Sequence, residues 1–226
     1  EGGVEVIKAI TSETLDASGQ SDSIIFASIR DDDILGSSGD DVIYANLGKD
    51  LVDGNDVIDG AGGSDVAMFV GNQSDYTFAS SVDGLTVTVT ETNTGEGDVL
   101  TNVETMRFAD GDITVSADGN GLVLTGSSGA DRITIVGDVP VTVLGGGEAD
   151  VIVGDLGGDI LAGEDGADVI TGGGGADTID GGAGDDTITG AEGDDTIDGG
   201  EGDDVAVYAG NQSDYTFESS ADGLTV

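Results

Sequence analysis

The chain has 226 residues, of which 47 are acidic and 5 basic, so its formal net charge at pH 7 is −42. This charge excludes nucleic acid and anionic membrane surfaces as partners held by direct attraction, and divalent cations are the natural counterpart. The absence of cysteine and histidine excludes disulfides and the usual zinc and haem sites. No apolar run approaches the length of a membrane span, so direct membrane insertion is not expected.

Residues 1–68 are predicted to form a degenerate solenoid of nine-residue units. The units 8–16, 17–25 and 27–35 have lost nearly all their glycines, GSSGDDVIY (36–44) is nearly complete, ANLGKDLVD (45–53) is partial, and GAGGSDVAM (60–68) ends the block. Apolar residues are expected inside, among them Ile34, Ile43, Val52 and Ile58. For residues 8–35, both a metal-binding and a metal-free solenoid remain open.

Residues 69–125 have a different pattern and are predicted to form a small β cap and connector. Alternating segments indicate two hairpins, the first from 75–78 with 85–90 and the second from 102–108 with 110–115. Asp83-Gly84 is a turn signal within the first hairpin. A solenoid needs its open end covered, which is the role expected here.

Residues 126–207 are predicted to form the best-preserved block. A lone unit, GSSGADRIT (126–134), restarts the pattern, and 135–144 is interpreted as an insertion. Seven units then follow in one register: GGGEADVIV, GDLGGDILA, GEDGADVIT, GGGGADTID, GGAGDDTIT, GAEGDDTID and GGEGDDVAV. Each unit starts with glycine and has aspartate at position six. Such a fixed period is typical of a solenoid and is not expected of a flexible acidic linker.

The nine-residue unit combines the groups that a calcium site needs. Glycine at positions one, two and four admits unusual backbone angles, so the turn can aim several carbonyl oxygens at one point. The aspartate adds a carboxylate, and calcium takes six to eight oxygen ligands. The last three residues form a brief strand whose middle side chain points inward. One apolar column, or two facing columns, should contain Ile152, Leu161, Ile170, Ile179, Ile188 and Ile197.

Two units should close one coil, so that each turn stacks on the turn two units later with an ion between them. The aspartate pairs brought together in this way are Asp150–Asp168, Asp159–Asp177, Asp168–Asp186, Asp177–Asp195 and Asp186–Asp204. Five complete sites are therefore predicted in this block. In the degenerate first block, the candidate ligands are Asp41, Asp50 and Asp65.

A longer repeat is also present. Residues 66–87 match residues 205–226 at 17 of 22 positions, at an offset of 139 residues. We therefore expect one and a partial second copy of a module from a longer protein, with 208–226 as the truncated start of a second cap.

No catalytic constellation is recognised, so the segment is not expected to be an enzyme. Gly48-Lys49-Asp50 lacks the Ser or Thr of a phosphate-binding loop. Paired acids such as Asp185-Asp186 recur in the repeats, so ligation and solvation explain them better than acid–base catalysis. The outward threonines form too irregular a row to indicate an ice- or sugar-binding face.

The unit pattern of 145–207 resembles the RTX (repeats-in-toxin) calcium-binding nonapeptide family. In addition, LTNVETMRFADGDI resembles the strand module that often follows RTX arrays. The resemblance implies an all-β fold, in which right-handed parallel β-roll blocks alternate with the small β cap. It also implies several Ca²⁺ ions, type I secretion, and a secreted or cell-surface location in bacteria.

Two functions agree with these features, and in both of them metal binding supplies folding free energy. The first is a structural module of a large adhesin-like protein that extracellular calcium folds and stiffens. The duplication favours it, because repeating a module builds length. The alternative is a calcium-dependent folding and secretion domain of a toxin or secreted enzyme whose catalytic part lies elsewhere. No residue pattern identifies a surface or matrix ligand.

Overall fold

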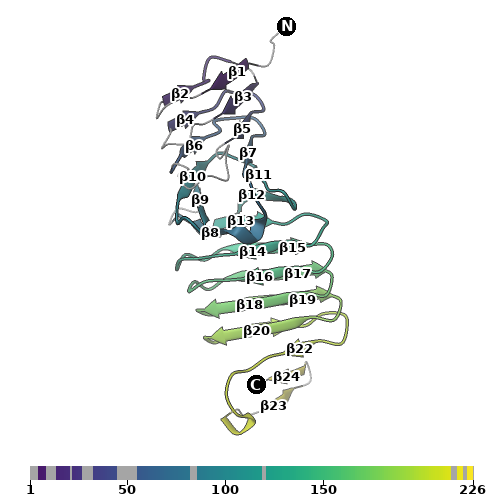
Figure 1. The fold of residues 1–226 in the computed structure, drawn as a ribbon. Coiled ribbons are helices and arrows are strands. Elements are labelled where there is room, and N and C mark those ends of the chain that lie inside the picture. The colour runs from purple at the N-terminus through teal and green to yellow at the C-terminus, as the bar shows by residue number, and fades with distance from the viewer. Residues whose placement is uncertain are drawn as a thin grey trace.

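The computed structural model describes residues 5–8, 14–20, 22–26, 33–44, 55–81, 86–118, 121–214, 218–220 and 223–225. These residues form an elongated solenoid whose coils stack along one axis (Figure 1). They contain no α-helix, only short 3-10 turns at Gln73–Asp75 and Gln212–Asp214, so no described helix has the length and apolar character to cross a membrane. The predicted all-β class with parallel β-roll blocks is confirmed.

One sheet extends along nearly the whole molecule. This sheet A has eleven strands, in the order β1 (Glu5–Lys8), β3 (Ser23–Phe26), β5 (Val42–Tyr44), β7 (Val66–Met68), β11 (Thr105–Arg107), β12 (Asp112–Asp118), β13 (Gly121–Thr125), β15 (Thr142–Gly146), β17 (Ile160–Asp165), β19 (Thr178–Ala183) and β21 (Thr196–Asp198). We call β1–β7 the first roll, residues 69–125 the connector and β14–β22 the second roll.

Two shorter sheets complete the rolls. Sheet B belongs to the first roll and the connector and has the order β2 (Thr14–Asp16), β4 (Asp33–Leu35), β6 (Val57–Asp59), β10 (Gly97–Thr101), β9 (Thr86–Glu91), β8 (Tyr76–Ser80). Sheet C belongs to the second roll, with β14 (Arg132–Thr134), β16 (Val151–Val153), β18 (Val169–Gly174), β20 (Thr187–Glu192) and β22 (Val205–Ala206). A separate hairpin joins β23 (Glu218–Ser220) to β24 (Gly223–Thr225).

The second roll has the predicted coil of two units. Ile152 pairs with Ile170 in sheet C, and Leu161 pairs with Ile179 in sheet A, so paired residues are 18 apart in sequence. Of the two arrangements left open for the inward side chains, the structure has two facing columns. These are Ile152, Ile170 and Ile188 from sheet C and Leu161, Ile179 and Ile197 from sheet A. All except Ile197 are at most 1% exposed, and burying each contributes about 1.5–3 kcal/mol.

The interpretation of residues 135–144 as an insertion is wrong. The segment contains the first three residues of β15, which pairs with β17 so that Val143 lies opposite Leu161. The N–H of Val141 donates to Asp159 Oδ1 over 3.0 Å, in the place of a position-six residue. This segment therefore forms one more unit, which the sequence conceals because valine replaces the aspartate and the turn has lost its pattern.

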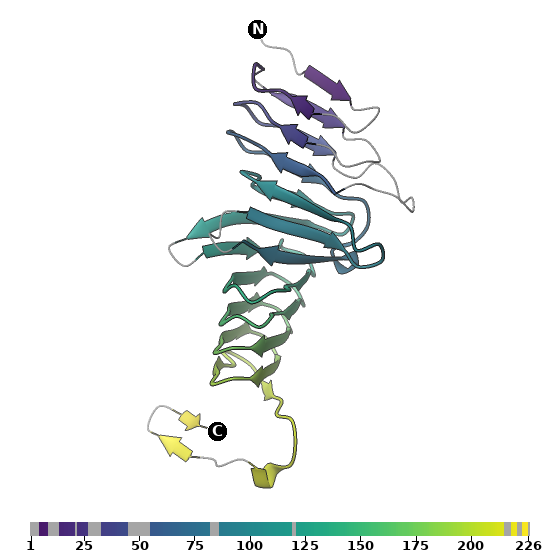
Figure 2. The same ribbon diagram turned by 90° about the vertical axis from the view of Figure 1, so that its left-hand side faces the viewer.

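The connector is built into the solenoid (Figure 2). Both predicted hairpins are confirmed, because β8 pairs antiparallel with β9 and β11 with β12; the turn signal Asp83-Gly84 lies outside the described residues. In addition, β10 continues sheet B from β6, and β11 continues sheet A from β7. An aromatic cluster of Phe69, Tyr76, Phe78 and Phe108 fills the connector core. The predicted boundaries of the four segments stay predictions.

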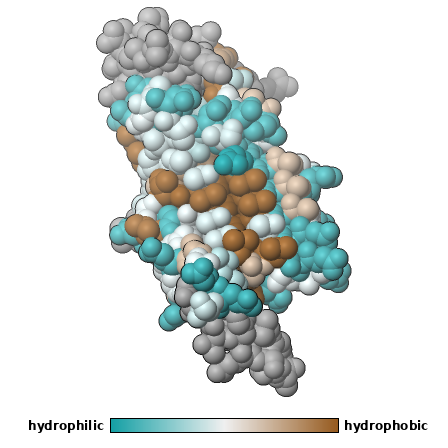
Figure 3. All heavy atoms as spheres, turned by 60° about the horizontal axis from the view of Figure 1, so that its bottom comes forward, coloured by the Kyte–Doolittle hydropathy of each residue, from teal (hydrophilic) through white to brown (hydrophobic). Residues whose placement is uncertain are grey.

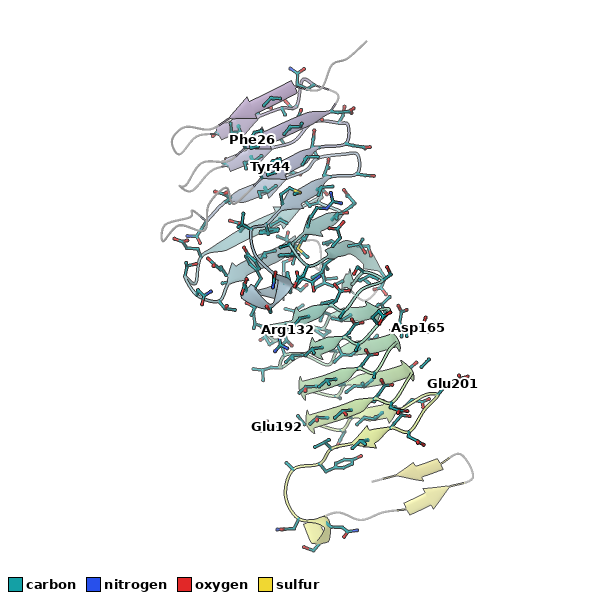
Figure 4. All side chains as sticks on the ribbon, turned by 45° about the vertical axis from the view of Figure 1, so that its right-hand side comes forward. Phe26, Tyr44, Arg132, Asp165, Glu192 and Glu201 are labelled. Atoms are coloured by element: carbon teal, nitrogen blue, oxygen red, sulfur yellow. The ribbon has the colours of Figure 1, made fainter. Side chains whose placement is uncertain are left out.

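The first roll repeats the coil with less regular turns. The inward residues Ile34, Ile43 and Ile58 are at most 1% exposed, as predicted, whereas Val52 lies outside the described residues. On the outer face of sheet A, the rings of Phe26 and Tyr44 stack 4.6 Å apart (Figure 4). This stack adds a lateral contact between coils whose turns have lost their glycines.

Candidate metal centres

The position-six carboxylates form two ladders, one along each turn edge of the second roll. In both ladders the backbone N–H of one aspartate donates to Oδ1 of the aspartate one coil further on. The distances are 2.7 Å for Asp150–Asp168, 2.8 Å for Asp168–Asp186, 3.0 Å for Asp186–Asp204, 2.8 Å for Asp159–Asp177 and 3.1 Å for Asp177–Asp195. The structure thus brings together all five predicted pairs, and their role as metal ligands stays a prediction.

These carboxylates are buried without a cationic partner. Asp150, Asp159, Asp168, Asp177 and Asp186 are each 1% exposed. In the described part of the chain, the one ion pair is Arg107–Asp112, which lies in the connector. Because a buried charge without a partner is costly, the ladders call for counter-ions.

In five units the second carboxylate oxygen receives no hydrogen bond. This oxygen, Oδ2, is buried and without a described donor in Asp65, Asp150, Asp168, Asp177 and Asp186. A backbone carbonyl lies beside it. At Gly163, for example, a side-chain carbon would overlap both Asp168 Oδ2 and the carbonyl oxygen of Gly181, one coil further on. Two oxygens facing a space that glycine leaves empty fit a hard cation such as calcium.

Glycine is therefore needed at position one for a different reason from the predicted one. None of them between Gly145 and Gly199 has φ in the left-handed region, so unusual backbone angles do not require glycine there. Glycine is required because any Cβ would fill the space between the oxygens. Nowhere in the described ranges do three acidic side chains converge. Backbone carbonyls must therefore supply much of any coordination shell.

Position two decides whether Oδ2 is left free. In the five units with a free Oδ2, the residue at position two has positive φ: Ala61 71°, Gly146 110°, Glu164 72°, Gly173 110° and Gly182 100°. We call these open turns. Glu164 and Ala61 adopt this conformation at a steric cost of about 1–2 kcal/mol, which indicates that the surrounding coil imposes it.

Three other units have a closed turn, in which the position-two N–H bonds to the carboxylate of its own unit. Ser37 donates to Asp41 Oδ2 over 2.6 Å, and Asp155 donates to Asp159 Oδ2 over 3.1 Å. Ser127 does the same for Asp131. The Ser37 hydroxyl adds a bond to Asp41 Oδ1 of 2.8 Å. Hydrogen bonds thus occupy both oxygens of Asp41 and of Asp159, so neither carboxylate needs an ion to be satisfied.

Burial changes the acidity of the ladder. It raises the pKa of Asp150 and of Asp65 to about 7 and that of Asp159 to about 6, and the backbone N–H donors offset this only in part. The pKa values of Asp168 and Asp177 are also raised, again mainly by burial. A bound cation would offset these shifts, because it stabilises the ionised form while the carboxylates stay buried.

Protons should stabilise the metal-free fold below neutral pH. Folded but metal-free, Asp150 titrates near pH 7, above its ordinary value of 3.8, so the metal-free fold loses stability as pH rises from 3.8 to 7. We expect the folding equilibrium constant in chelator to be about tenfold larger at pH 6 than at pH 8 for each such carboxyl. Circular dichroism in chelator at both pH values tests this, and a β signal that does not rise at pH 6 contradicts it.

Three predicted ligands are not among the buried carboxylates described above. Asp195 and Asp204 are half-buried at the C-terminal end of the second roll. Asp50 lies outside the described residues. Sequence reasoning missed Asp98 and Glu104, which extend the ladders of the first roll by accepting the N–H groups of Asp56 and Asp65 over 2.9 and 2.8 Å. One feature of the sequence could have identified them: like the position-six aspartates, each is followed two residues later by an apolar residue, Leu100 or Met106.

At the start of the second roll, the Gln73 side chain of the connector makes the hydrogen bonds that a preceding coil makes elsewhere in the roll. Within the roll, the N–H after each aspartate donates to the aspartate carbonyl of the preceding coil, as Val169 does to Asp150 over 2.9 Å. At the first coil, the N–H of Arg132 instead donates to Gln73 Oε1 over 2.8 Å, and Gln73 Nε2 donates to Asp131 Oδ1. The side-chain amide thus replaces a missing peptide group.

Replacing Gln73 with alanine should weaken the second roll. The change leaves the buried Oδ1 of Asp131 and the partly buried N–H of Arg132 without Gln73. The buried group alone costs about 1–3 kcal/mol, which corresponds to a melting temperature in saturating calcium at least about 2 °C lower. Gln212, its counterpart 139 residues later, is exposed and provides the matched control. Thermal melts of Gln73→Ala and Gln212→Ala that coincide would exclude this role for Gln73.

The comparison with protein-family models agrees with this geometry. The family model for the RTX calcium-binding nonapeptide repeat matches four stretches, at residues 26–55, 53–67, 144–179 and 171–206. Comparison with curated protein sequences gives no match. Among solved structures, the extracellular lipase LipA from Serratia marcescens is similar over 91% of this chain and 36% of its own, with 19% identity and a TM-score of 0.27. This chain thus spans about a third of that protein.

The two lines of observation, buried aspartate ladders with free oxygens and the family match in both rolls, agree with each other. RTX repeats bind Ca²⁺, and the ladders fit several ions. The chain therefore carries RTX calcium-binding nonapeptide repeats, folded as β-rolls.

Proposed function

We propose that this segment is a structural module of a large secreted or cell-surface protein of the adhesin type, which extracellular calcium folds and stiffens. The observation that supports it best is the set of five buried carboxylates whose Oδ2 has no hydrogen-bond donor. Without cations these groups oppose folding, and with cations they hold successive coils together. Because the complete sites do not exist in the unfolded chain, calcium affinity becomes folding free energy.

The continuous sheet A supports a stiffening role. It passes from the first roll through the connector into the second roll without an edge, so hydrogen bonds between strands join the whole length. A module that propagates its sheet in this way extends a rod instead of adding a flexibly tethered domain. Each further copy of the module would then lengthen the rod. The proposal includes no catalytic step, and the buried acids instead serve as links between coils.

A calcium titration followed by far-UV circular dichroism tests the proposal, with magnesium at matched ionic strength as control. We expect a cooperative gain of β signal with calcium alone, at about 10⁻⁴–10⁻³ M as in other extracellular calcium modules. A chain already folded in chelator, or equally folded by magnesium, would contradict the proposal. Analytical ultracentrifugation at the same points should show compaction, because neutralisation and coil stacking end the self-repulsion of the acidic chain.

The second candidate is a folding and secretion domain of a toxin or secreted enzyme. It is favoured by the net charge of −42, which keeps the chain expanded where calcium is scarce and thus suits export before folding. The regions encoded beside this segment distinguish the two candidates. Further copies of the 139-residue module support the adhesin, whereas a neighbouring catalytic domain supports the secretion role.

A further inference from the structure

The connector closes the first roll with a shortened turn. Within the second roll, the N–H of a position-one glycine donates to the residue just before the position-one glycine two units later, as Gly154 does to Thr171 over 2.8 Å. At the end of the first roll, Gly60 makes the equivalent bond to Thr101 of the connector over 3.0 Å. Asn102 therefore occupies the place of the next position-one glycine.

Residues 102–104 also supply the two oxygen groups of a complete turn. The Asn102 carbonyl oxygen lies beside Asp65 Oδ2, and a Cβ at Gly60 would overlap both atoms, as at several position-one glycines of the second roll. Glu104 accepts the N–H of Asp65 over 2.8 Å, which a position-six aspartate does elsewhere. That aspartate lies five residues after its glycine, whereas Glu104 lies two residues after Asn102. The longer glutamate side chain compensates for the shorter backbone.

The Asn102 carbonyl is held in this position by a constrained backbone. Asn102 has φ of 52°, in the left-handed region, which asparagine enters more readily than most other residues. Its side-chain amide donates to Asp59 Oδ1 over 2.8 Å, and the same oxygen accepts the N–H of Ala61 over 3.0 Å. Hydrogen bonds to the first roll thus orient the carbonyl toward Asp65.

Asp65 is a buried carboxylate among other acids. Figure 3 shows hydrophilic residues along both flanks of the visible surface, where water solvates them. Asp65 is instead 0% exposed, and its Oδ2 has no hydrogen-bond donor in the described structure. Burial, followed by repulsion from Asp41, Glu104 and Asp40, raises its pKa to about 7. Two oxygens that face each other in this way, one of them on a carboxylate, repel unless a cation lies between them.

We infer that a calcium ion bound between Asp65 Oδ2 and the Asn102 carbonyl links the first roll to the connector. The nonapeptide pattern does not assign this site, because the connector contains no repeat unit and the family match in the first roll ends at residue 67. The inference rests on the proposed function and deepens it, since calcium then stiffens the junction between two parts of the module as well as the rolls themselves.

The junction of the connector with the second roll is built differently. There Gln73 Nε2 donates to Asp131 Oδ1, and the N–H of Ser127 donates to Asp131 Oδ2. Both oxygens of that carboxylate are therefore satisfied by hydrogen bonds. Calcium thus links the connector to the first roll, whereas the connector is joined to the second roll without an ion.

Counting the calcium ions bound by the full chain tests the inference, with Asp65→Asn and Gly60→Ala as variants and Gly62→Ala as control. In Asp65→Asn, the amide nitrogen that replaces Oδ2 can donate to the Asn102 carbonyl, so this chain should bind one ion fewer. Gly60→Ala should also lose one ion, because its Cβ fills the space between the two oxygens. A Cβ at Gly62, in the same turn, meets no atom within 4 Å, so Gly62→Ala should bind the full number in equilibrium dialysis.

Hydrogen exchange in saturating calcium reports on the junction itself. The Gly60 N–H donates across it to the Thr101 carbonyl, and the Thr105 N–H donates to the Asp65 carbonyl over 3.1 Å. Protection of these two amides should persist in Asp65→Asn, where a hydrogen bond replaces the ion. It should fall at least about tenfold in Gly60→Ala, where nothing replaces it.

Three outcomes would contradict the inference. Equal ion counts for Asp65→Asn and the unchanged chain would overturn it alone, since calcium-dependent folding of the second roll would remain. Equal losses in Gly60→Ala and Gly62→Ala would also overturn it, because the loss would then follow any change in this turn. A chain that calcium never folds, as judged by circular dichroism, would overturn the proposed function and this inference with it.

Discussion

Asp168→Ala should abolish calcium-dependent folding of the second roll or raise its calcium midpoint by at least about tenfold. The substitution removes the acceptor of the Asp150 N–H and leaves a buried donor unsatisfied, at a cost of about 1–3 kcal/mol. It also removes a free Oδ2 and, with it, the folding free energy of any ion held there. Native domains have only about 5–15 kcal/mol of stability, so the combined loss is decisive.

Asp165→Ala provides a matched control for that experiment. Asp165 lies in the same turn but is exposed and points away from the core (Figure 4). Its removal changes the net charge by the same amount without affecting the ladder. Calcium titrations monitored by circular dichroism, with equilibrium dialysis to count bound ions, compare the two variants. Equal midpoints and equal ion counts for both would show that the ladder does not hold calcium.

Gly172→Ala should be almost as damaging, although it adds a single methyl group. That carbon would overlap Asp177 Oδ2 and the carbonyl oxygen of Gly190, which face the same space. We expect loss of the calcium transition, or a midpoint about tenfold higher, because the methyl group displaces both the oxygens and any ion between them. The position-one glycine is thus expected to be as necessary as the aspartate.

Gly147→Ala is the control for this second experiment. A Cβ at Gly147 meets its nearest neighbours in Ser128 at 3.5–3.7 Å, which is ordinary contact. Since alanine also restricts the unfolded chain, this variant should be neutral or stabilised by about 0.4–1 kcal/mol. Thermal melts and calcium titrations of the two variants should therefore diverge. A Gly172→Ala protein that behaves like Gly147→Ala would refute the oxygen-lined space at position one.

The sequence predicted those features that follow from the phase of the repeat. The alternation within each brief strand required Ile170 to point inward, and the nine-residue period placed Asp150 beside Asp168. Both results depend only on spacing, because strand geometry converts a fixed period into a fixed register. The five aspartate pairs of the second roll follow from such spacing, and the two hairpins of the connector follow from the alternation within their strands.

Other features depend on backbone direction and on contacts distant in sequence, which spacing does not encode. The backbone N–H groups of Ser37 and Asp155 point to the position-six aspartate of the same unit, whereas that of Glu164 does not. The residue type at position two does not predict which of the two arrangements forms. Gln73 reaches Arg132 across 59 residues. The unit at 135–144 was concealed because Val141 replaces the acid whose recurrence defines the pattern.

The continuous sheet A has a consequence for the symmetry of the module. β7 belongs to sheet A, whereas its counterpart β22 belongs to sheet C on the opposite wall of the second roll. One passage through the connector therefore exchanges the two walls, as a screw axis with a half-turn per step would. The outward side chains of Val66 and Val205, equivalent in sequence, look out from opposite flanks. In the rod of repeated modules proposed above, a binding partner that recognises one wall would meet it on alternate flanks, and the repeat in space would be two modules.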